Sequence, residues 1–146
     1  MLEFKKVIPS DSYALGRFFP DLKSKYFFPH PMTEKEAKRI CRYQGKDSYY
    51  VATENGYVLA YGMLRGWDDG WKIPSLGIAV QPLYRGSGLA RSFMYFLHSA
   101  AWVNGATKVR LKVFPRNTRA VRLYKSLGYK FERKKENGQL VGFIKL

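Results

Sequence analysis

A glycine-rich segment between a predicted strand and a predicted helix constrains this chain more than any other stretch. Residues 81–90, Gln-Pro-Leu-Tyr-Arg-Gly-Ser-Gly-Leu-Ala, follow the apolar run 73–80 and lead into residues 89–102, whose apolar spacing predicts a helix. Such a turn gathers several unpaired backbone N–H groups around one point, where the helix dipole adds partial positive charge. The segment is therefore typical of a phosphate-binding turn, although glycine turns of this spacing also occur without a ligand.

Three residues of the turn suit a phosphate ligand. Gly86 and Gly88 carry no Cβ, so the backbone can approach a ligand closely, and Arg85 adds a positive charge at the rim. The dinucleotide-binding fingerprint fits less well, because neither a third glycine nor an acidic ribose-binding residue follows. The Walker pattern is absent, since the chain has no Gly-Lys-Ser/Thr.

Two motifs resemble the signatures of one known family. The spacing Arg85-x-x-Gly88-x-Ala90 is similar to the Gln/Arg-x-x-Gly-x-Gly/Ala signature of the GCN5-related N-acetyltransferase (GNAT) family. Residues 117–129 resemble its later signature, Asn-x-x-Ala-x-x-Leu-Tyr-x-x-x-Gly-Phe/Tyr. Two matches in the right order and at the right spacing argue against coincidence. The resemblance covers residues 75–146, with a looser fit of the N-terminal half.

The predicted order of elements is β, α, α, β, β, β, α, β, α, β, β, from hydrophobic periodicity and turn residues. This order agrees with the fold that the resemblance implies. That fold is α/β (α+β), with a mixed, mostly antiparallel sheet of six to seven strands flanked by about four helices. The family's sheet splays between the fourth and fifth strands, and acetyl-coenzyme A (acetyl-CoA) lies in the gap. We expect residues 1–146 to form a single domain of this kind.

Local signals set several expected boundaries. Pro20 is expected to close the first helix, and the capping box Thr33-Glu-Lys-Glu36 is expected to start the second. Gly77, within the fourth strand, is the expected site of a β-bulge. Cys41 lies at helical spacing from Ala37, which predicts a buried structural thiol rather than a nucleophile.

The resemblance implies a binding site for acetyl-CoA as co-substrate and no metal. In the family, backbone amides of the turn grip the pyrophosphate, and the splayed strand pairs with the pantetheine arm. Asn117 would contact the cofactor by its motif position, and it is also a candidate cap for the helix that starts there. The corresponding cofactor-binding positions are Ile78, Ala79, Val80, Arg85, Gly86, Ser87, Gly88, Leu89, Ala90, Asn117 and Tyr124.

Tyr124 matches the tyrosine that the family places near the coenzyme sulfur. A phenol with an ordinary pKa of about 10 is protonated at neutral pH and can donate to a thiolate, so Tyr124 is the candidate general acid. The alternative is that Tyr124 only packs against the coenzyme or hydrogen-bonds to it. No cysteine motif supports an acyl-enzyme, so direct attack of the acceptor in a ternary complex is expected.

The sequence does not identify a general base. Many relatives use a glutamate on the fourth or fifth strand, but residues 70–131 contain no carboxylate. Asp69 and His30 are the leading candidates. Asp68, Glu54, a water relay or the absence of any protein base stay open as alternatives.

Aromatic residues in a predicted loop are candidates for an acceptor-binding wall. Residues 21–31 hold Tyr26, Phe27 and Phe28, which either fill the core from a loop or line a binding site. The resemblance implies the second role, because the connection between the first two helices commonly lines the acceptor site in the family.

Positive charge is concentrated in the second half of the chain. Residues 1–72 hold 12 Lys and Arg against 9 Asp and Glu, whereas residues 73–146 hold 14 against 2, within a total of +15. Strict alternation places Lys108, Arg110 and Lys112 on one face of a predicted strand, which makes Lys112 a candidate contact for an anionic acceptor. Such a field attracts polyanions, and CoA with its three phosphates is one; a solubilising basic surface is the alternative.

The motifs together predict an acetyl-CoA-dependent N-acetyltransferase that acts on a primary amine, with a small molecule or an amino sugar favoured. The alternatives are a non-catalytic acyl-CoA-binding protein and a basic nucleic-acid-binding module. Nucleic acid is not an expected partner, because the chain has neither an RNA-stacking motif nor a helix-turn-helix. No signal peptide or membrane span is recognisable, so a cytoplasmic location is expected. The resemblance leaves a homodimer open.

Overall fold

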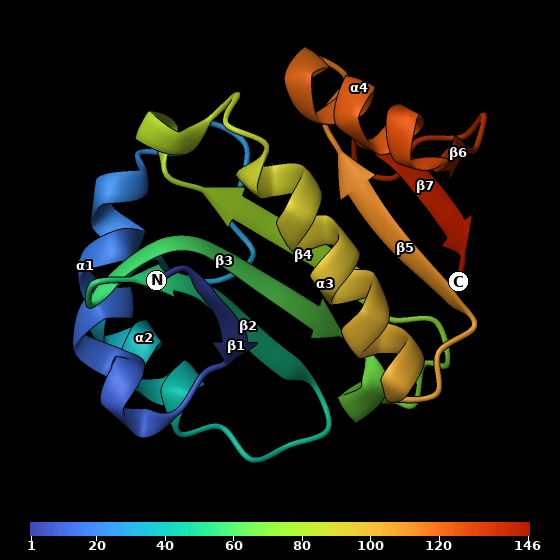
Figure 1. Ribbon diagram of the computed structural model, residues 1–146. Coiled ribbons are helices and arrows are strands. Elements are labelled where there is room, and N and C mark those ends of the chain that lie inside the picture. Colours follow the sequence, from blue (N-terminus) through green and yellow to red (C-terminus); the bar gives the residue numbers. More distant parts are fainter.

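Seven strands form one sheet in the order β1-β2-β3-β4-β5-β7-β6, shown in Figure 1. The computed structural model describes all of residues 1–146. Neighbouring strands are antiparallel except for β4 and β5, which are parallel. The strands are β1 (Glu3–Lys6), β2 (Ser48–Glu54), β3 (Tyr57–Arg65), β4 (Ser75–Val80), β5 (Lys108–Val113), β6 (Lys130–Phe131) and β7 (Leu140–Lys145).

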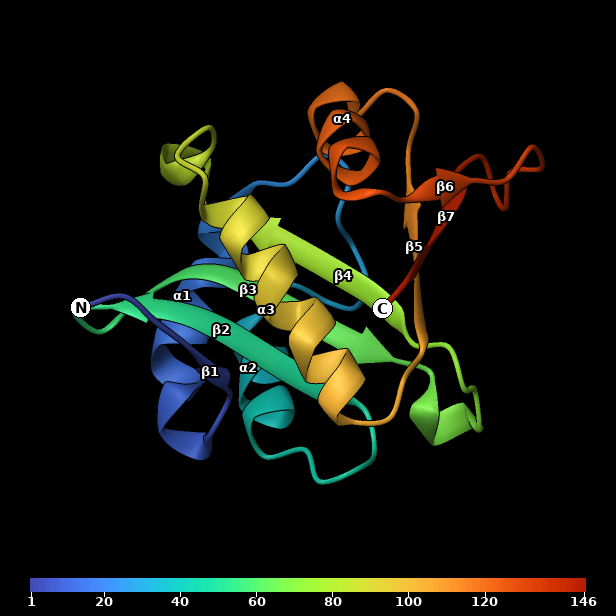
Figure 2. The same ribbon diagram turned by 45° about the vertical axis from the view of Figure 1, so that its right-hand side comes forward.

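Four α-helices flank the sheet, and Figures 1 and 2 show α1 and α2 on one face and α3 across the other. The sheet and helices confirm the predicted fold class and the predicted order of elements. Three short 3-10 helices, η1 (Pro9–Asp11), η2 (Trp67–Asp69) and η3 (Pro82–Tyr84), lie in the connections. The α-helices are α1 (Ser12–Leu22), α2 (Glu34–Cys41), α3 (Leu89–Val103) and α4 (Thr118–Leu127).

Two hydrophobic cores lie on opposite faces of the sheet. One contains Phe93 of α3 and Tyr124 of α4, and the other contains Phe18 of α1. Strand β3 contributes to both, since Leu64 belongs to the first core and Tyr61 to the second. Because both faces of β3 are covered, its sequence is almost continuously apolar instead of alternating.

The sheet splays between β4 and β5, as predicted. Strand β4 pairs with β3 along its whole length, but it pairs with β5 only at Ser75 and Arg110. There the Arg110 N–H also donates to the Pro74 carbonyl at 3.0 Å. Beyond this point the two strands diverge (Figure 2). Residues 76–80 of β4 therefore have no strand partner on the edge that faces β5.

The first helix does not end at Pro20, so that prediction is wrong. Pro20 lies inside α1, which continues to Leu22 and ends where Lys23 adopts a left-handed φ of 46°. Proline removes one backbone hydrogen bond, but the buried side chains of Phe19 and Leu22 hold the last turn against the core. The predicted start of α2 is confirmed, because the Thr33 hydroxyl accepts a hydrogen bond from the Glu36 N–H at 3.1 Å.

Gly77 does not form a bulge, and the β3–β4 register is regular at this residue. The register shift in the sheet lies instead between Ala52 and Thr53. A Cβ at position 77 would lie 2.6 Å from Met63 Cε and 3.2 Å from Phe27 Cε1. An alanine at position 77 would therefore have to displace the end of the Met63 side chain and would press against the Phe27 ring.

Candidate active site

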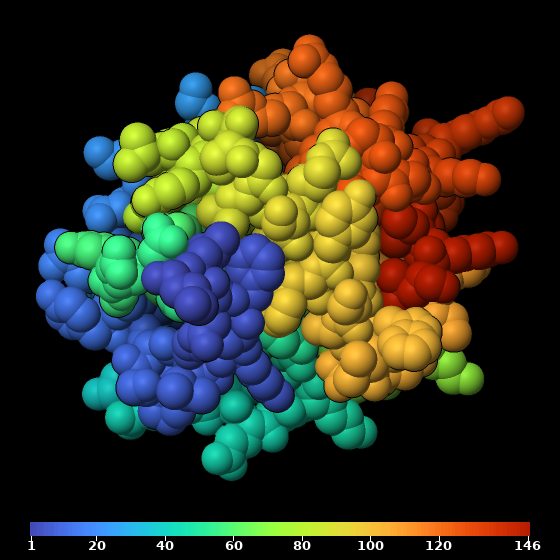
Figure 3. Space-filling model, viewed as in Figure 1, coloured from blue at the N-terminus to red at the C-terminus, as the bar shows by residue number.

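The glycine turn lies between the C-terminal end of β4 and the start of α3. Gly86 has a φ of 79° and Gly88 a φ of 89°, values that favour glycine over residues with a side chain. No atom lies within 4 Å of the Cβ position at either residue, so this side of the turn faces open space. In Figure 3 the turn and α3 lie at the molecular surface, with α4 alongside.

Four backbone N–H groups at this turn have no acceptor in the chain, those of Gly86, Gly88, Ala90 and Arg91. They belong to the turn and the first residues of α3, where the helix dipole favours an anion. The other backbone N–H groups of residues 85–90 donate hydrogen bonds within the glycine turn. The Arg85 N–H donates to the Pro82 carbonyl (3.2 Å), the Ser87 N–H to the Tyr84 carbonyl (3.2 Å) and the Leu89 N–H to the Ser87 hydroxyl (3.3 Å).

A second set of unpaired backbone groups lies next to the turn, on the splayed edge of β4. Strand β4 pairs with β3 on one side only. Because backbone groups alternate in direction along a strand, those of Ala79 face Tyr61 of β3, whereas those of Ile78 and Val80 face the open edge. This edge can accept an extended ligand that carries amide groups, since such a ligand can take the place of a neighbouring strand. The structure thus joins the predicted strand positions and the predicted turn positions into one continuous surface.

Tyr124 lies on α4, and its residue is 8% exposed. Its hydroxyl forms no hydrogen bond within the chain. It is also not a fully buried polar atom without a partner, since the Tyr43 hydroxyl oxygen is the only such side-chain atom. The Tyr124 hydroxyl therefore keeps contact with solvent. Burial raises the pKa of Tyr124 to about 12, so the phenol is protonated throughout the neutral range. This combination suits a proton donor.

Asn117 precedes α4 without capping it. Its side chain makes no capping hydrogen bond, and only its backbone carbonyl participates, accepting from the Val121 N–H at 3.0 Å. The alternative role considered for this residue is therefore wrong. The side-chain amide is left without a structural partner and is free to bind a ligand.

His30 is packed against β3 in the second core region. Its Nδ1 lies 2.8 Å from the Pro31 carbonyl oxygen and its Nε2 lies 2.9 Å from the Tyr61 hydroxyl. Because a carbonyl can only accept, Nδ1 carries the proton and Nε2 accepts from Tyr61. Burial lowers the pKa of His30 and raises the pKa of Tyr61, so both groups are neutral at pH 7. The Nε2 atom, the only nitrogen of His30 that could accept a proton, therefore already accepts a hydrogen bond from Tyr61.

Asp69 lies in η2, before the start of β4, whereas the glycine turn follows the end of that strand. Six residues of β4 (Ser75–Val80) separate the two ends, about 20 Å at the usual rise of a strand. Figure 1 shows η2 and α4 at opposite ends of the molecule. The structure does not bring Asp69 and Tyr124 together. The neighbouring Asp68 has a structural role, since it accepts a hydrogen bond from the Lys46 N–H at 2.8 Å.

The aromatic residues of the α1–α2 connection lie across the face of the sheet opposite α3. The Phe27 ring lies over Gly77 of β4, and its centre is 6.3 Å from that of Tyr61. The Tyr26 ring lies 6.2 Å from Phe114, the residue that follows β5. Phe28 is 68% exposed. Phe27 therefore contacts the strand on one side of the splay, and Tyr26 contacts the end of the strand on the other.

The cations on β5 do not share one environment. Lys108 and Lys112 are exposed, while Arg110 is half-buried. Its guanidinium lies 2.6 Å from the Glu136 carboxylate and 5.8 Å from the centre of the Trp71 ring. Glu136 thus neutralises the central cation of the row, and Lys112 is a free positive charge on this face.

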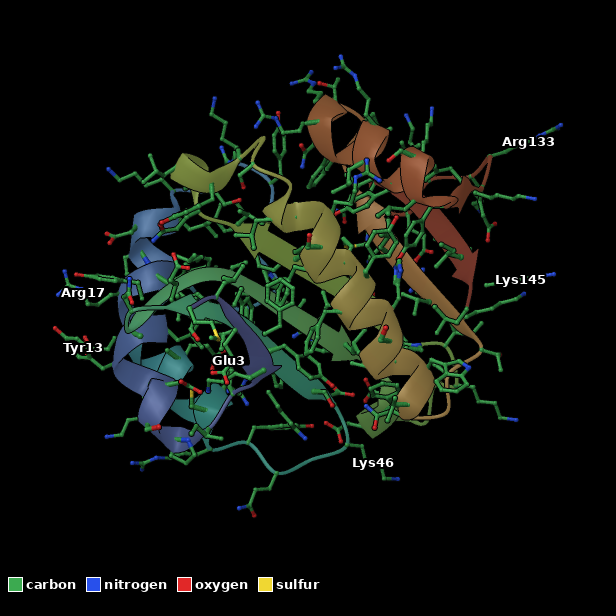
Figure 4. All side chains as sticks on the ribbon, viewed as in Figure 1. Glu3, Tyr13, Arg17, Lys46, Arg133 and Lys145 are labelled. Carbon is green, nitrogen blue, oxygen red and sulfur yellow. The ribbon has the colours of Figure 1, made fainter.

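Two cavities border the glycine turn. The larger, about 750 Å³, lies between α1, the β2–β3 turn and residues 81–84, and its wall includes Tyr13 and Arg17, which lie side by side in Figure 4. The smaller, about 510 Å³, lies between the start of α3 and the N-terminal part of α4. It is lined by Arg91, Thr118, Arg119, Arg122, Leu123 and Ser126.

One contributor to the site, and one residue that packs beside it, were not singled out from the sequence. Arg91 supplies both a free N–H and a cavity-lining side chain, and its only sequence signal is that it follows the first motif directly. Tyr129 lies beside Tyr124, with ring centres 5.7 Å apart, and its hydroxyl lies 2.6 Å from His98 Nε2. No spacing rule in the sequence indicates the contact between His98 and Tyr129, because these two residues are 31 positions apart.

The sequence profile of the acetyltransferase (GNAT) family matches residues 15–129. No curated protein sequence matches the chain. No group of three or more His, Cys, Asp or Glu side chains is placed to hold a metal ion, and none of the helices has the length and apolar character that crossing a membrane requires.

Solved structures share the fold at low sequence identity. An acetyltransferase of the GNAT family from Streptococcus pneumoniae aligns with a TM-score of 0.86 at 18% identity, over 100% of this chain and 99% of that one. The GNAT domain of PAT from S. lividans aligns with a TM-score of 0.85 at 18% identity, over 99% and 90%. The yncA protein from Salmonella typhimurium, assigned as an acetyltransferase and solved with its cofactor acetyl-CoA, aligns with a TM-score of 0.73 at 19% identity, over 99% and 92%.

Proposed function

The chain belongs to the acetyltransferase (GNAT) family, and from this premise we propose that it is an acetyl-CoA-dependent N-acetyltransferase. Its acceptor would be a primary amine on a small molecule or an amino sugar, and residues 1–146 would act as one catalytic domain. The observation that carries the proposal is the adjoining pair of unpartnered backbone surfaces. One is the set of N–H groups at Gly86, Gly88, Ala90 and Arg91, and the other is the open edge of β4.

These surfaces match the two chemically different parts of the coenzyme. The free N–H groups would bind the diphosphate, and Arg85 would add its charge at the rim. Ile78 and Val80 would pair with the amides of the pantetheine arm, Ala79 would lie between them on the same strand, and the free side chain of Asn117 would reach the same ligand. Acetyl-CoA supplies an activated thioester carbonyl when it is bound.

Tyr124 would act as the general acid. The amine nitrogen attacks the thioester carbonyl directly, the carbon–sulfur bond breaks, and the Tyr124 hydroxyl donates its proton to the departing sulfur. The acetylated nitrogen releases one proton to solvent, and the Tyr124 phenolate takes one proton back from solvent, so the net products are the amide and the free thiol. The raised pKa of Tyr124 supports this role, because the phenol is protonated at every pH at which the enzyme would work.

We propose that no protein side chain acts as the base and that solvent accepts the proton of the amine. Asp69 lies at the far end of β4, and the Nε2 atom of His30 already accepts a hydrogen bond from Tyr61. A His30→Gln enzyme is then expected to keep its kcat within about twofold, whereas loss of a true base costs about 10²-fold or more. A loss of that size in the folded variant would make His30 the base.

The acceptor would bind on the face of the sheet opposite α3. Tyr26, Phe27 and Phe28 would form its apolar wall, and Lys112 would contact an anionic group where the acceptor carries one. The proximity of Tyr26 to Phe114 supports this placement, because it brings the loop to the end of β5 beside the splay. Turnover of matched anionic and neutral amines by the Lys112→Ala enzyme tests the contact, and an unchanged ratio would remove Lys112 from the site.

Calorimetry and a substrate screen test the proposed function. Acetyl-CoA at one hundred times its Kd should stabilise the fold by about 2.7 kcal/mol, a rise in Tm of roughly 5–10 °C for a chain of this size. A panel of amine classes, followed by thiol release, would then identify the acceptor. Absence of both heat of binding and thermal stabilisation would refute the proposal.

A non-catalytic acyl-CoA-binding protein is the second candidate. It would bind the coenzyme with the same backbone groups but release no thiol with any amine. The Tyr124 hydroxyl, which forms no hydrogen bond within the chain, favours the enzyme, since a binding protein has no use for a protonated phenol that lacks a structural partner.

A further inference from the structure

Three arginines line the smaller cavity with no counter-ion. Arg91 comes from α3, and Arg119 and Arg122 come from α4. The chain has three ion pairs between Lys or Arg and a carboxylate, and none of them includes these residues. No carboxylate occurs between residues 70 and 131 that could neutralise the cluster. Like charges brought together repel one another unless an anion lies between them, so this arginine cluster is suited to a polyanionic ligand.

The guanidinium of Arg91 is already positioned by a neighbouring helix. It donates a hydrogen bond to the Ser126 hydroxyl at 2.8 Å, and that hydroxyl donates to the Leu123 carbonyl at 2.7 Å. A guanidinium has five N–H donors, so most of those on Arg91 stay available. Thr118 adds a hydroxyl to the same cavity. The cavity therefore offers directed donors as well as charge.

Arg91 also connects this cavity to the glycine turn. Its backbone N–H is one of the four free amides of the turn, while its side chain lines the cavity. A ligand that carries two separate phosphate groups a short distance apart can occupy both surfaces at once. In coenzyme A the diphosphate and the 3′-phosphate are attached to the same ribose, which meets that requirement.

We propose that the arginine cluster of Arg91, Arg119 and Arg122 binds the 3′-phosphate of coenzyme A. This inference rests on the proposed function and adds to it a subsite and a specificity. The protein distinguishes coenzyme A from its 3′-dephospho form by charge-assisted hydrogen bonds to one additional dianionic group. Figure 4 shows nitrogen-tipped side chains projecting from α4, in keeping with an exposed, cationic rim on that helix.

Isothermal titration calorimetry with coenzyme A and 3′-dephospho-coenzyme A tests the subsite without any acceptor. The wild-type protein is expected to bind coenzyme A at least about tenfold more tightly than the dephospho form, since hydrogen bonds between charged groups are about twice as strong as neutral ones. Arg119→Gln and Arg122→Gln should each reduce this preference by about threefold or more and leave the affinity for the dephospho form unchanged.

Arg133→Gln is the matched control. Arg133 is exposed, belongs to no ion pair, and in Figure 4 it projects from the edge of the C-terminal strands. The substitution removes the same charge from the molecule, so a preference that survives in this variant shows that local contacts matter more than net charge. Thermal unfolding of every variant shows that the fold is intact.

Each result separates the subsite from the proposed function. Equal wild-type affinities for the two coenzymes would overturn the subsite and leave acetyl-CoA binding in place. A drop in affinity that is the same for both coenzymes, or the same in Arg133→Gln, would also overturn it. Binding of neither coenzyme would overturn both proposals. Displacement of coenzyme A by single-stranded RNA, together with equal binding of the two coenzymes, would assign the arginine cluster to nucleic acid instead.

Discussion

Replacing Tyr124 by phenylalanine removes one oxygen atom from the candidate site and little else. The Tyr124 hydroxyl has no hydrogen-bond partner within the chain, so the variant loses no structural hydrogen bond. The ring itself stays in the first core, where it packs beside Tyr129. We therefore expect a Tm within about 2 °C of the wild type, because an unpartnered hydroxyl contributes little to stability.

The effect on catalysis should be much larger. A general acid typically contributes about 10²- to 10⁴-fold, so kcat at saturating acetyl-CoA should fall by about two orders of magnitude or more. The Kd for acetyl-CoA should change little, because none of the proposed diphosphate and pantetheine contacts involves the Tyr124 hydroxyl. With a pKa of about 12, only about one phenol in 10⁴ is ionised at pH 8. The wild-type rate should therefore show no loss from Tyr124 ionisation below about pH 10.

Release of coenzyme A thiol, measured with the best amine from the screen, is the assay. Tyr129→Phe serves as the matched control, because it also removes one phenolic oxygen within the same aromatic pair. That oxygen hydrogen-bonds to His98 at 2.6 Å, so its loss should cost about 1 kcal/mol of stability while turnover is kept. Full turnover by Tyr124→Phe, or equal losses of turnover in both variants, would refute the assignment of Tyr124 as the acid.

Two further predictions concern the fold. Gly77→Ala should lower the free energy of unfolding by about 1–3 kcal/mol in urea titrations, because the new Cβ would lie 2.6 Å from Met63 Cε; no loss would mean that Met63 moves aside freely. Burial lowers the pKa of both His30 and His98 below the ordinary 6.5. The unfolded chain then binds more protons as the pH falls through 6.5. We expect less stability at pH 5.5 than at pH 7.5, and a smaller difference in His98→Gln. An unchanged pH dependence in that variant would show that His98 does not contribute.

The sequence predicted those parts of the fold that local patterns determine. Hydrophobic periodicity and turn residues gave every strand and helix in the right order, and the Thr33 cap agrees with the structure. The errors arose where tertiary packing overrode a local preference. Pro20 stays helical because its neighbours are buried, and Gly77 is explained by side chains from β3 and from the α1–α2 connection. The packing around Pro20 and the packing around Gly77 both depend on residues that are distant in the chain, so neither can be predicted from a single stretch of sequence.

The candidate site was predictable where a motif describes backbone geometry. The glycine turn could be located from its spacing, and Tyr124 from its place in the motif that resembles the family signature. The sequence could not show which amides are free, because that depends on the internal hydrogen bonds of Arg85, Ser87 and Leu89. Nor could it show that Asp69 lies at the far end of a strand from Tyr124. Proximity along the chain made Asp69 a candidate, and the direction of β4 separates it from the turn.

The distribution of counter-ions changes the interpretation of the positive charge. From the sequence, the row of Lys108, Arg110 and Lys112 was the most prominent cationic feature of the second half. In the structure, Glu136 neutralises the middle residue of that row. The arginine cluster of Arg91, Arg119 and Arg122 has no such partner. These three exposed cations come from two neighbouring helices, and an anionic ligand bound between them would reduce their mutual repulsion. The excess charge of this half is therefore better explained by binding of the coenzyme phosphates than by an acidic acceptor.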